Sequence, residues 1–173
     1  MKKKILLFIL LLSQPLLSQN TEAARKLLDE VSGKISSFKN MKFNFTYVLE
    51  NRPENIRQET NGSVTISKDL YRINFLGFEQ LFDGKMTYTI IPENEEITIN
   101  DPEEESEFGI NPSEILTIYK KDYAYQWDIK QNVMGTPVQF VKLIPNEEKK
   151  ELKYLLLGID MRTKLIHRLI EIG

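Results

Sequence analysis

The sequence predicts an α+β fold, in which an antiparallel β-sheet is covered by a few helices. The main observation is the stretch 71–100, where apolar and polar residues tend to alternate, as they do in strands that bury one face. A second is the three- and four-residue spacing of apolar residues between Ala24 and Phe38, which is typical of an amphipathic helix. A third is the series of β-like segments from Trp127 to Ile172.

The first residues are typical of a secretory signal peptide. Lysines at positions 2–4 precede an apolar run, Ile5–Leu12, that is too short to span a bilayer. Small and polar residues follow this run, so we expect residues 1–18 to be a signal peptide that is cleaved after Ser18. The alternative is a membrane anchor that is left uncut.

Composition excludes several classes of protein. Removal of the three N-terminal lysines changes the formal net charge from −2 to −5, and an acidic protein is poorly suited to bind nucleic acid or anionic membranes. The absence of cysteine excludes disulfides and an N-terminal lipidated cysteine. Residues 19–173 have the length of one domain, and they contain no further apolar run that could span a membrane.

The first predicted helix begins at Glu22, with Thr21 as its cap, and ends near Phe38. Gly33 weakens it by about 1 kcal/mol relative to alanine. The apolar stripe consists of Ala24, Leu27, Leu28, Val31, Ile35 and Phe38.

Strands are expected next. Alternation over 43–49 predicts a half-buried strand, and the polar segment 51–55 predicts a turn. Residues 56–67 resemble one strand that is interrupted at Asn61-Gly62 by a bulge or bend, with a true turn as the alternative. Residues 67–69 then turn the chain into the stretch 71–100.

The dipeptide Asp83-Gly84 predicts a tight type I′ hairpin turn, because glycine adopts positive φ without a steric clash. Ile91–Asn94 predicts a second turn, which leads into a short strand at 97–99. The alternating residues around Asp83-Gly84 are Tyr71, Ile73 and Phe75 before the turn and Met86, Tyr88 and Ile90 after it.

The acidic segment 101–107 predicts a solvated loop. Calcium binding is the alternative, although the spacing lacks the glycine that a calcium loop requires. A helix begins at Pro112 and ends by Lys121, and its apolar side consists of Ile115, Leu116, Ile118 and Tyr119.

Three strands are expected near the C-terminus, over 138–144, 152–159 and 165–172, with a turn at 160–163. The last of these strands is expected to form an unpaired edge of the sheet, which folded proteins usually cover with another element.

No catalytic constellation is evident. His167 is the single histidine, it lies in a predicted strand, and no GxSxG, phosphate loop or dinucleotide motif is present. With one histidine and no cysteine, the usual zinc sites are excluded. We therefore predict that the protein is not an enzyme and has no cofactor and no metal site.

The strands place nine apolar residues on what we expect to be one face of the sheet: Phe43, Phe45, Tyr47, Tyr71, Ile73, Phe75, Met86, Tyr88 and Ile90. Two helices are available to cover it. Periodicity alone favours an ordinary packed core, whereas a curved sheet with helices across its mouth can hold a hydrophobic ligand.

The order of the elements and several local phrases resemble the LolA-type outer-membrane lipoprotein carrier family. The matching parts are the signal peptide, the helix 23–38 with its continuation VSGKISSFKNMKFNF, Gly62-Ser63-Val64, Tyr71–Phe75, Leu81–Lys85 with Tyr88 and Pro92, the helix 112–120, and Leu157–Asp160. The resemblance covers essentially the whole mature chain.

This resemblance implies an unclosed, strongly curved antiparallel β-barrel with helices as a lid. It implies a monomeric periplasmic carrier that takes lipoproteins from an inner-membrane ABC-type release complex to an outer-membrane acceptor. The acyl chains would lie against the nine apolar residues. The lid would consist of Leu27, Leu28, Val31, Ile115, Leu116 and Tyr119. The alternative is a periplasmic binding or sensor module of the same fold that acts through protein–protein contacts of the acidic loop Asp101–Glu107.

Two positions depart from the family. Some members have an Arg-Pro latch after the third strand, where this chain has Lys68-Asp69, so the latch is not carried over. Members of the family also run on beyond the point that corresponds to Gly173. We therefore expect a carrier domain that is truncated at its C-terminus.

Overall fold

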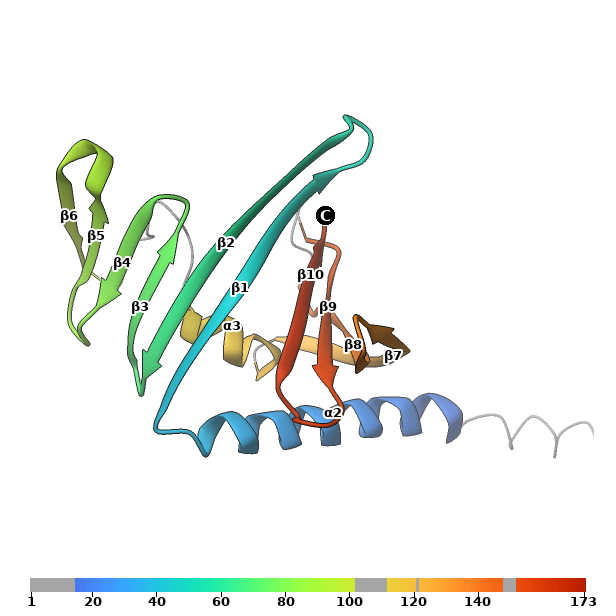
Figure 1. Cartoon of the computed structure of the whole chain (residues 1–173). Helices are drawn as coiled ribbons and strands as arrows, with labels where there is room; N and C mark the ends of the chain where they lie inside the picture. Colours follow the sequence, from blue (N-terminus) through green and yellow to red (C-terminus); the bar gives the residue numbers. More distant parts are fainter. Residues whose placement is uncertain (1–14, 102–111, 121, 148–151) are drawn as a thin grey trace, which may run out of the picture. The chain divides into compact units, whose positions relative to one another are not determined.

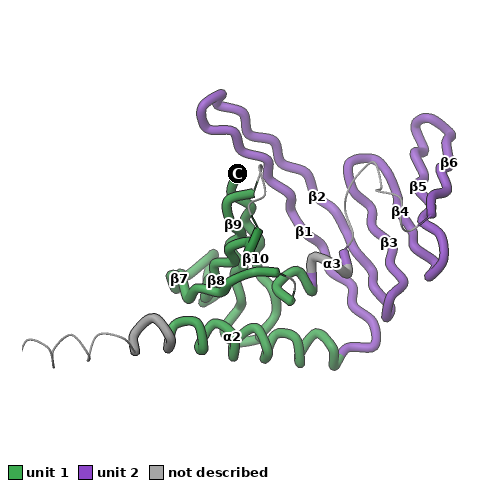
Figure 2. The backbone as a smooth tube through the Cα atoms, turned by 180° about the vertical axis from the view of Figure 1, so that it is seen from behind, with its two compact units in different colours: residues 1–37, 117–173 green, residues 38–116 purple. Residues whose placement is uncertain are grey.

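The computed structural model describes residues 15–101, 112–120, 122–147 and 152–173, and these form two compact units. Unit 1 contains residues 1–37 and 117–173, and unit 2 contains residues 38–116 (Figure 2). Each unit has its own antiparallel sheet and its own apolar core. The predicted antiparallel α+β architecture is therefore confirmed, but the expectation of a single sheet is wrong.

Unit 1 combines one long helix with a four-stranded sheet (Figure 1). The sheet has the order β10-β9-β8-β7, which puts β10 at an edge as expected. The elements are α2 (Pro15–Ser36), η2 (Ile118–Lys120), β7 (Tyr123–Val133), β8 (Thr136–Pro145), β9 (Tyr154–Asp160) and β10 (Ile166–Ile172).

The core of unit 1 lies between the apolar stripe of α2 and the four-stranded sheet of the same unit. The predicted stripe residues Ala24, Leu27, Leu28 and Val31 are all buried, together with Tyr119 of η2. They share one cluster with Val141, Leu143, Leu155, Leu157 and Ile159 of β8 and β9. Burial of each large aliphatic side chain contributes about 1.5–3 kcal/mol, so this cluster is the main source of stability in unit 1.

The start of α2 differs from the prediction. The helix begins at Pro15, a position that suits proline because the first helical turn has no partner for its N–H group. Thr21 therefore lies inside the helix, and the predicted cap is wrong. The helix ends at Ser36, so Phe38 lies beyond it and is exposed. Cleavage after Ser18 stays a prediction.

Unit 2 is an antiparallel meander in which each strand pairs with the next, from β1 to β6. A six-residue helix, α3, follows and ends at the boundary of the two units. The elements are β1 (Asn40–Asn51), β2 (Ile56–Ser67), β3 (Leu70–Phe75), β4 (Phe78–Phe82), β5 (Thr87–Ile91), η1 (Pro92–Asn94), β6 (Glu96–Asn100) and α3 (Pro112–Thr117).

Strand β2 is continuous across Asn61-Gly62. Its register with β1 runs without a shift from Asn40 opposite Ser67 to Asn51 opposite Ile56, so neither the expected bulge nor a turn is present. Gly62 lies opposite Phe45, and a Cβ atom at Gly62 would lie 2.3 Å from the Cζ atom of that ring. Glycine is needed here because the aromatic ring covers the strand.

Two turns set the register of the meander. Leu76 and Gly77 both have positive φ, 49° and 82°, and they join β3 to β4 as a two-residue turn in which Phe75 pairs with Phe78. The sequence predicts the tight turn at Asp83-Gly84 instead. The hairpin there is confirmed, but it has four residues between Phe82 and Thr87 and is not type I′, because Gly84 alone among them has positive φ.

The side chain of Asp83 organises this four-residue turn. Its Oδ1 atom accepts hydrogen bonds from the backbone N–H groups of Met86 (2.9 Å) and Lys85 (2.8 Å). Its Oδ2 atom accepts one from the hydroxyl of Tyr88 at 3.1 Å. The backbone donors of Met86 and Lys85 hold the pKa of Asp83 below its ordinary value.

The predicted acidic loop lies almost entirely outside the described residues. Of residues 101–107, the structure describes Asp101 alone, which is exposed. Within the described chain, no helix is long and apolar enough to cross a membrane.

Two substitutions in α2 test the placement of its stripe. Leu28 is 2% exposed, so Leu28→Ala is expected to lower the free energy of unfolding by about 2–5 kcal/mol. Gly33→Ala is the matched control, because a Cβ at Gly33 meets no atom within 4 Å and alanine favours the helix by about 0.5–1 kcal/mol. Urea unfolding measures both, and equal effects of the same sign would contradict the packing.

The Asp83 turn predicts a pH effect on stability. Because the pKa of Asp83 is lower in the folded protein, its contribution is present above about pH 4 and is lost as the pH falls through the folded value. Asp83→Asn keeps an acceptor oxygen but does not titrate. Its stability, measured by thermal unfolding between pH 5 and pH 2, is expected to fall less steeply than that of the wild type. Parallel profiles would show that the turn does not stabilise the carboxylate.

Candidate functional site

The register of unit 2 decides which side chains share a face of its sheet. Side chains that pair directly across antiparallel strands lie on the same face. We define the aromatic face as the face that carries Tyr71, Ile73 and Phe75 of β3. Phe82, Gln80 and Phe78 of β4 pair with these three residues and lie on the aromatic face as well.

Six aromatic rings gather on the aromatic face. The ring of Phe75 lies 5.4 Å from the rings of Phe45 and Tyr47 and 6.2 Å from the ring of Phe78, measured between centroids. Tyr71 and Phe82 form a further pair at 5.7 Å. These are the separations at which aromatic pairs attract each other beyond the effect of burial. Three strands, β1, β3 and β4, thus supply one aromatic surface.

The aromatic face is buried on β3 and exposed on β1. Ile73, Phe75 and Phe78 are at most 4% exposed, and Val64 and Ile66 of β2 are equally buried. On β1, by contrast, Phe43 is 37% exposed and Tyr47 is 45% exposed. The face therefore has a packed centre and an open apolar margin along β1.

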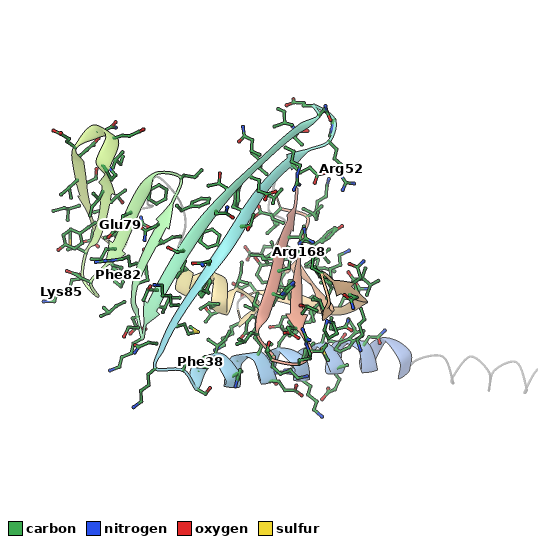
Figure 3. All side chains as sticks on the ribbon, in the orientation of Figure 1. Phe38, Arg52, Glu79, Phe82, Lys85 and Arg168 are labelled. Atoms are coloured by element: carbon green, nitrogen blue, oxygen red, sulfur yellow. The ribbon has the colours of Figure 1, made fainter. Side chains whose placement is uncertain are left out.

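Tyr88 and Ile90 do not join this face, so the expectation of nine residues on one face is wrong for them. Tyr88 pairs with Leu81 and Ile90 pairs with Glu79, and both partners lie on the opposite face. Figure 3 labels Glu79 and Phe82, which are three residues apart on β4 and therefore lie on opposite faces of the strand. Met86 lies in the turn before β5.

Phe78 and Phe82 are the aromatic residues of this face that the sequence analysis missed. The signal was present, because Phe78, Gln80 and Phe82 alternate with Glu79 and Leu81 just after Gly77. Asp83-Gly84 is the stronger turn signal, and it outweighs the turn signal of Leu76-Gly77. The structure places the tight turn one strand earlier.

Most of the residues expected to form a lid belong to the core of unit 1. Leu27, Leu28, Val31 and Tyr119 pack in the cluster with β8 and β9, so their side chains are core residues there. Leu116 of α3, which belongs to unit 2, does pack against the buried part of the aromatic face. The side chain of Ile115 lies outside the described part of the structure.

The aromatic face becomes polar at β4 and β5. Gln80 is 0% exposed, and Thr87 and Thr89 of β5, which pair with Phe82 and Gln80, are buried as well. Gln80 donates from Nε2 to the hydroxyl oxygen of Thr89 at 3.5 Å. Its Oε1 atom is buried and has no hydrogen-bond partner among the described residues. An unpaired buried acceptor costs about 1–3 kcal/mol, which makes this amide an exception that needs an explanation.

The opposite face of the sheet carries a polar hollow of about 540 Å³. It lies around Gly62, and Asn44, Asn61, Ser63 and Asn74 supply its polar side chains, with Thr46 donating to Asn61 Oδ1 at 2.9 Å. The hollow is open and holds no charged group among its lining residues. Phe45 and Gly62 complete its lining, which contains no titratable pair for catalysis.

In the described part of unit 2, titratable side chains form ion pairs on the face opposite the aromatic face, such as Arg57–Glu59 at 2.8 Å and Arg72–Glu79 at 3.2 Å. Among the described residues, no group of three or more His, Asp or Glu side chains is placed to hold a metal ion. His167 is exposed on β10. The prediction that the protein is not an enzyme remains a prediction.

Comparison with known proteins gives likeness to solved structures only. No protein-family model and no curated protein matches the sequence. The chain is similar to a DUF1329 family protein from Desulfovibrio piger, with a TM-score of 0.49 and 12% identity over 88% of this chain and 73% of that one. It is also similar to a putative outer membrane lipoprotein-sorting protein domain from Vibrio parahaemolyticus, with a TM-score of 0.48 and 12% identity over 88% and 72%. A LolA superfamily protein from Nitrosomonas europaea gives a TM-score of 0.40 and 10% identity over 87% and 71%.

A substitution at Gly62 tests the aromatic face. In Gly62→Ala the new methyl group would overlap the ring of Phe45, which must then move away from Phe75. We expect a loss of about 1–3 kcal/mol in the free energy of unfolding, as for other overpacked sites. In a Phe45→Ala background the same change should cost much less. A double-mutant cycle in urea measures the difference, and strictly additive effects would contradict the contact.

Proposed function

We propose that the protein is a periplasmic carrier that binds the acyl chains of lipoproteins on its aromatic face and moves them from the inner to the outer membrane. The observation that carries this proposal is the continuity of the aromatic face from the buried Phe75 and Phe78 to the exposed Phe43 and Tyr47. An ordinary core would end at the buried residues. Here the same apolar surface continues to solvent, where a ligand can lie against it.

The chemistry of the face suits an acyl chain. The paired rows Phe43–Val64–Ile73 and Met41–Ile66–Tyr71 contain no charged side chain. Each methylene group that leaves water contributes about 0.8 kcal/mol, so even part of an acyl chain supplies enough free energy for binding. Aromatic rings and a methionine adapt to chains of different shape. No bond is made or broken in this proposed function.

The proposed partners follow from the resemblance to the LolA-type family. An inner-membrane ABC-type complex would release the lipoprotein to this protein, and an outer-membrane acceptor would receive it. The periplasmic location follows from the predicted signal peptide over residues 1–18. The Lys68-Asp69 turn, in which Lys68 has a φ of 55°, stands where some family members have their latch, so this chain needs another way to hold its ligand.

A second candidate is a periplasmic binding or sensor module that acts through protein–protein contacts. The observation that favours it is the face opposite the aromatic face, where Ile97 and Ile99 of β6 are 62% and 57% exposed. These residues pair with Ile90 and Tyr88, so the four side chains form one apolar surface. A partner protein can recognise such a surface without any lipid.

Matched substitutions on the two faces separate the candidates. Tyr47→Asp puts a charge on the exposed margin of the aromatic face, and Ile97→Asp puts one on the opposite face; both positions are exposed, so both variants should fold. For a carrier, Tyr47→Asp should weaken the binding of a fluorescent fatty-acyl probe by about tenfold or more, whereas Ile97→Asp should leave it unchanged. Circular dichroism verifies folding of each variant.

The same variants should differ in what they carry in cells. Wild-type protein purified from the periplasm without detergent is expected to contain acylated lipoprotein by mass spectrometry, and Tyr47→Asp is expected to contain much less. If neither variant changes probe binding, or if the wild type binds no acyl probe, the carrier function is wrong. Loss of protein partners in Ile97→Asp alone would favour the sensor module.

A further inference from the structure

The aromatic face contains a buried polar group at its boundary with β5. Ile73, Gln80 and Thr89 pair in one row across β3, β4 and β5, and Gln80 is completely buried. Thr87 lies on the same face, opposite Phe82. A glutamine in such a position is unusual, because buried amides normally have all of their hydrogen-bonding groups paired.

The amide of Gln80 is only half satisfied. Its Nε2 atom donates to Thr89, while its Oε1 atom meets no donor among the described residues. The missing partner must supply an N–H or an O–H group. The side chains nearest in the pairing pattern are Ile73, which has no donor, and Thr89, which accepts from Nε2 and makes no hydrogen bond to Oε1.

We propose that Gln80 Oε1 accepts a hydrogen bond from a neutral N–H or O–H group at the head of the bound acyl ligand. This inference rests on the proposed carrier function and names the class of its ligand: an acyl chain that ends in an amide N–H or in a glyceryl hydroxyl. The chain lies against Phe43 on the exposed margin, and the head reaches Gln80, which stands in the same row (Phe43–Val64–Ile73–Gln80).

Distances within the sheet fit this arrangement. Neighbouring strands lie about 4.8 Å apart, and residues two apart on a strand are separated by about 6.6 Å. Phe43 and Gln80 lie three strands apart in one row, about 14 Å, so the exposed apolar margin and the polar group lie within the length of one acyl chain. The face is therefore amphipathic along a path that matches an acyl chain and its linkage.

The charge of the face selects against ionised head groups. The rows that contain Tyr71, Ile73 and Phe75 continue through Phe82, Gln80 and Phe78 to Thr87 and Thr89, without any charged side chain. A carboxylate or phosphate placed there would lose its hydration without gaining a counter-ion. A neutral donor meets the unpaired oxygen of Gln80 without this penalty.

Matched probes test the inference on the full chain. N-methylpalmitamide has one N–H donor and N,N-dimethylpalmitamide has none; monopalmitoylglycerol has hydroxyl donors and methyl palmitate has none. Dissociation constants are measured by displacement of a fluorescent fatty-acyl probe. The wild type is expected to prefer the donor-bearing member of at least one pair by about tenfold, and the pair that shows the preference identifies the linkage as an amide or a glyceride.

Substitution of Gln80 must remove this preference. Gln80→Leu is expected to bind both members of each pair about equally, while Thr98→Val, an exposed position in the same row, keeps the wild-type preference. Gln80→Leu should also raise the Tm of the ligand-free protein, because no buried acceptor remains unpaired. If Gln80→Leu does not fold, Gln80→Met, which has a similar length, replaces it.

The outcomes separate this inference from the proposed function. Equal binding of both members of each pair by the wild type, or an unchanged preference in the Gln80 variant, overturns the role of Gln80 and leaves the carrier function standing. Failure of the wild type to bind any of the four probes overturns both.

Discussion

The register of β3, β4 and β5 is the constraint on which the candidate site depends. Side chains alternate between the faces of a strand, so the number of residues in each turn decides which face receives each apolar residue. The two-residue turn at Leu76-Gly77 pairs Phe75 with Phe78, and the four-residue turn after Phe82 pairs Phe82 with Thr87. Together they place Phe78 and Phe82 with the aromatic residues of β3 and turn Tyr88 and Ile90 away.

Because of this register, the apolar side chains lie on one face of the sheet near β1 and on the opposite face near β6. The aromatic face carries apolar side chains on β1 and β3, becomes polar at Gln80 of β4, and carries Thr87 and Thr89 on β5. The opposite face is polar at Asn44 and Asn74 and becomes apolar at Ile97 and Ile99. Gln80 lies where the exchange occurs, which explains how an amide is buried beside aromatic rings.

The sequence predicts the strands of this protein better than their faces. The alternation over 43–49 and the polar segments at 51–55 and 67–69 locate β1, β2 and their turns, because these signals are local. Which side chains of β5 join the aromatic face depends in part on the turn at Leu76-Gly77. Leu76 has a positive φ there, which non-glycine residues rarely adopt. Residue preferences therefore give little indication of this turn. The division into two units cannot be predicted either, because an apolar stripe predicts an amphipathic helix but not the sheet against which it packs.

The packing of α2 limits how the aromatic face can be covered. Leu27, Leu28 and Val31 are buried against β8 and β9, and their removal from that core would cost about 1.5–3 kcal/mol for each side chain. The sum is comparable with the whole stability of a small domain, so α2 cannot open and close as a lid without unfolding unit 1. Leu116, which is only partly buried on a six-residue helix, makes a far smaller contribution. Under the proposed carrier function, cover of the aromatic face by Leu116 of α3 would disrupt less packing than a movement of α2.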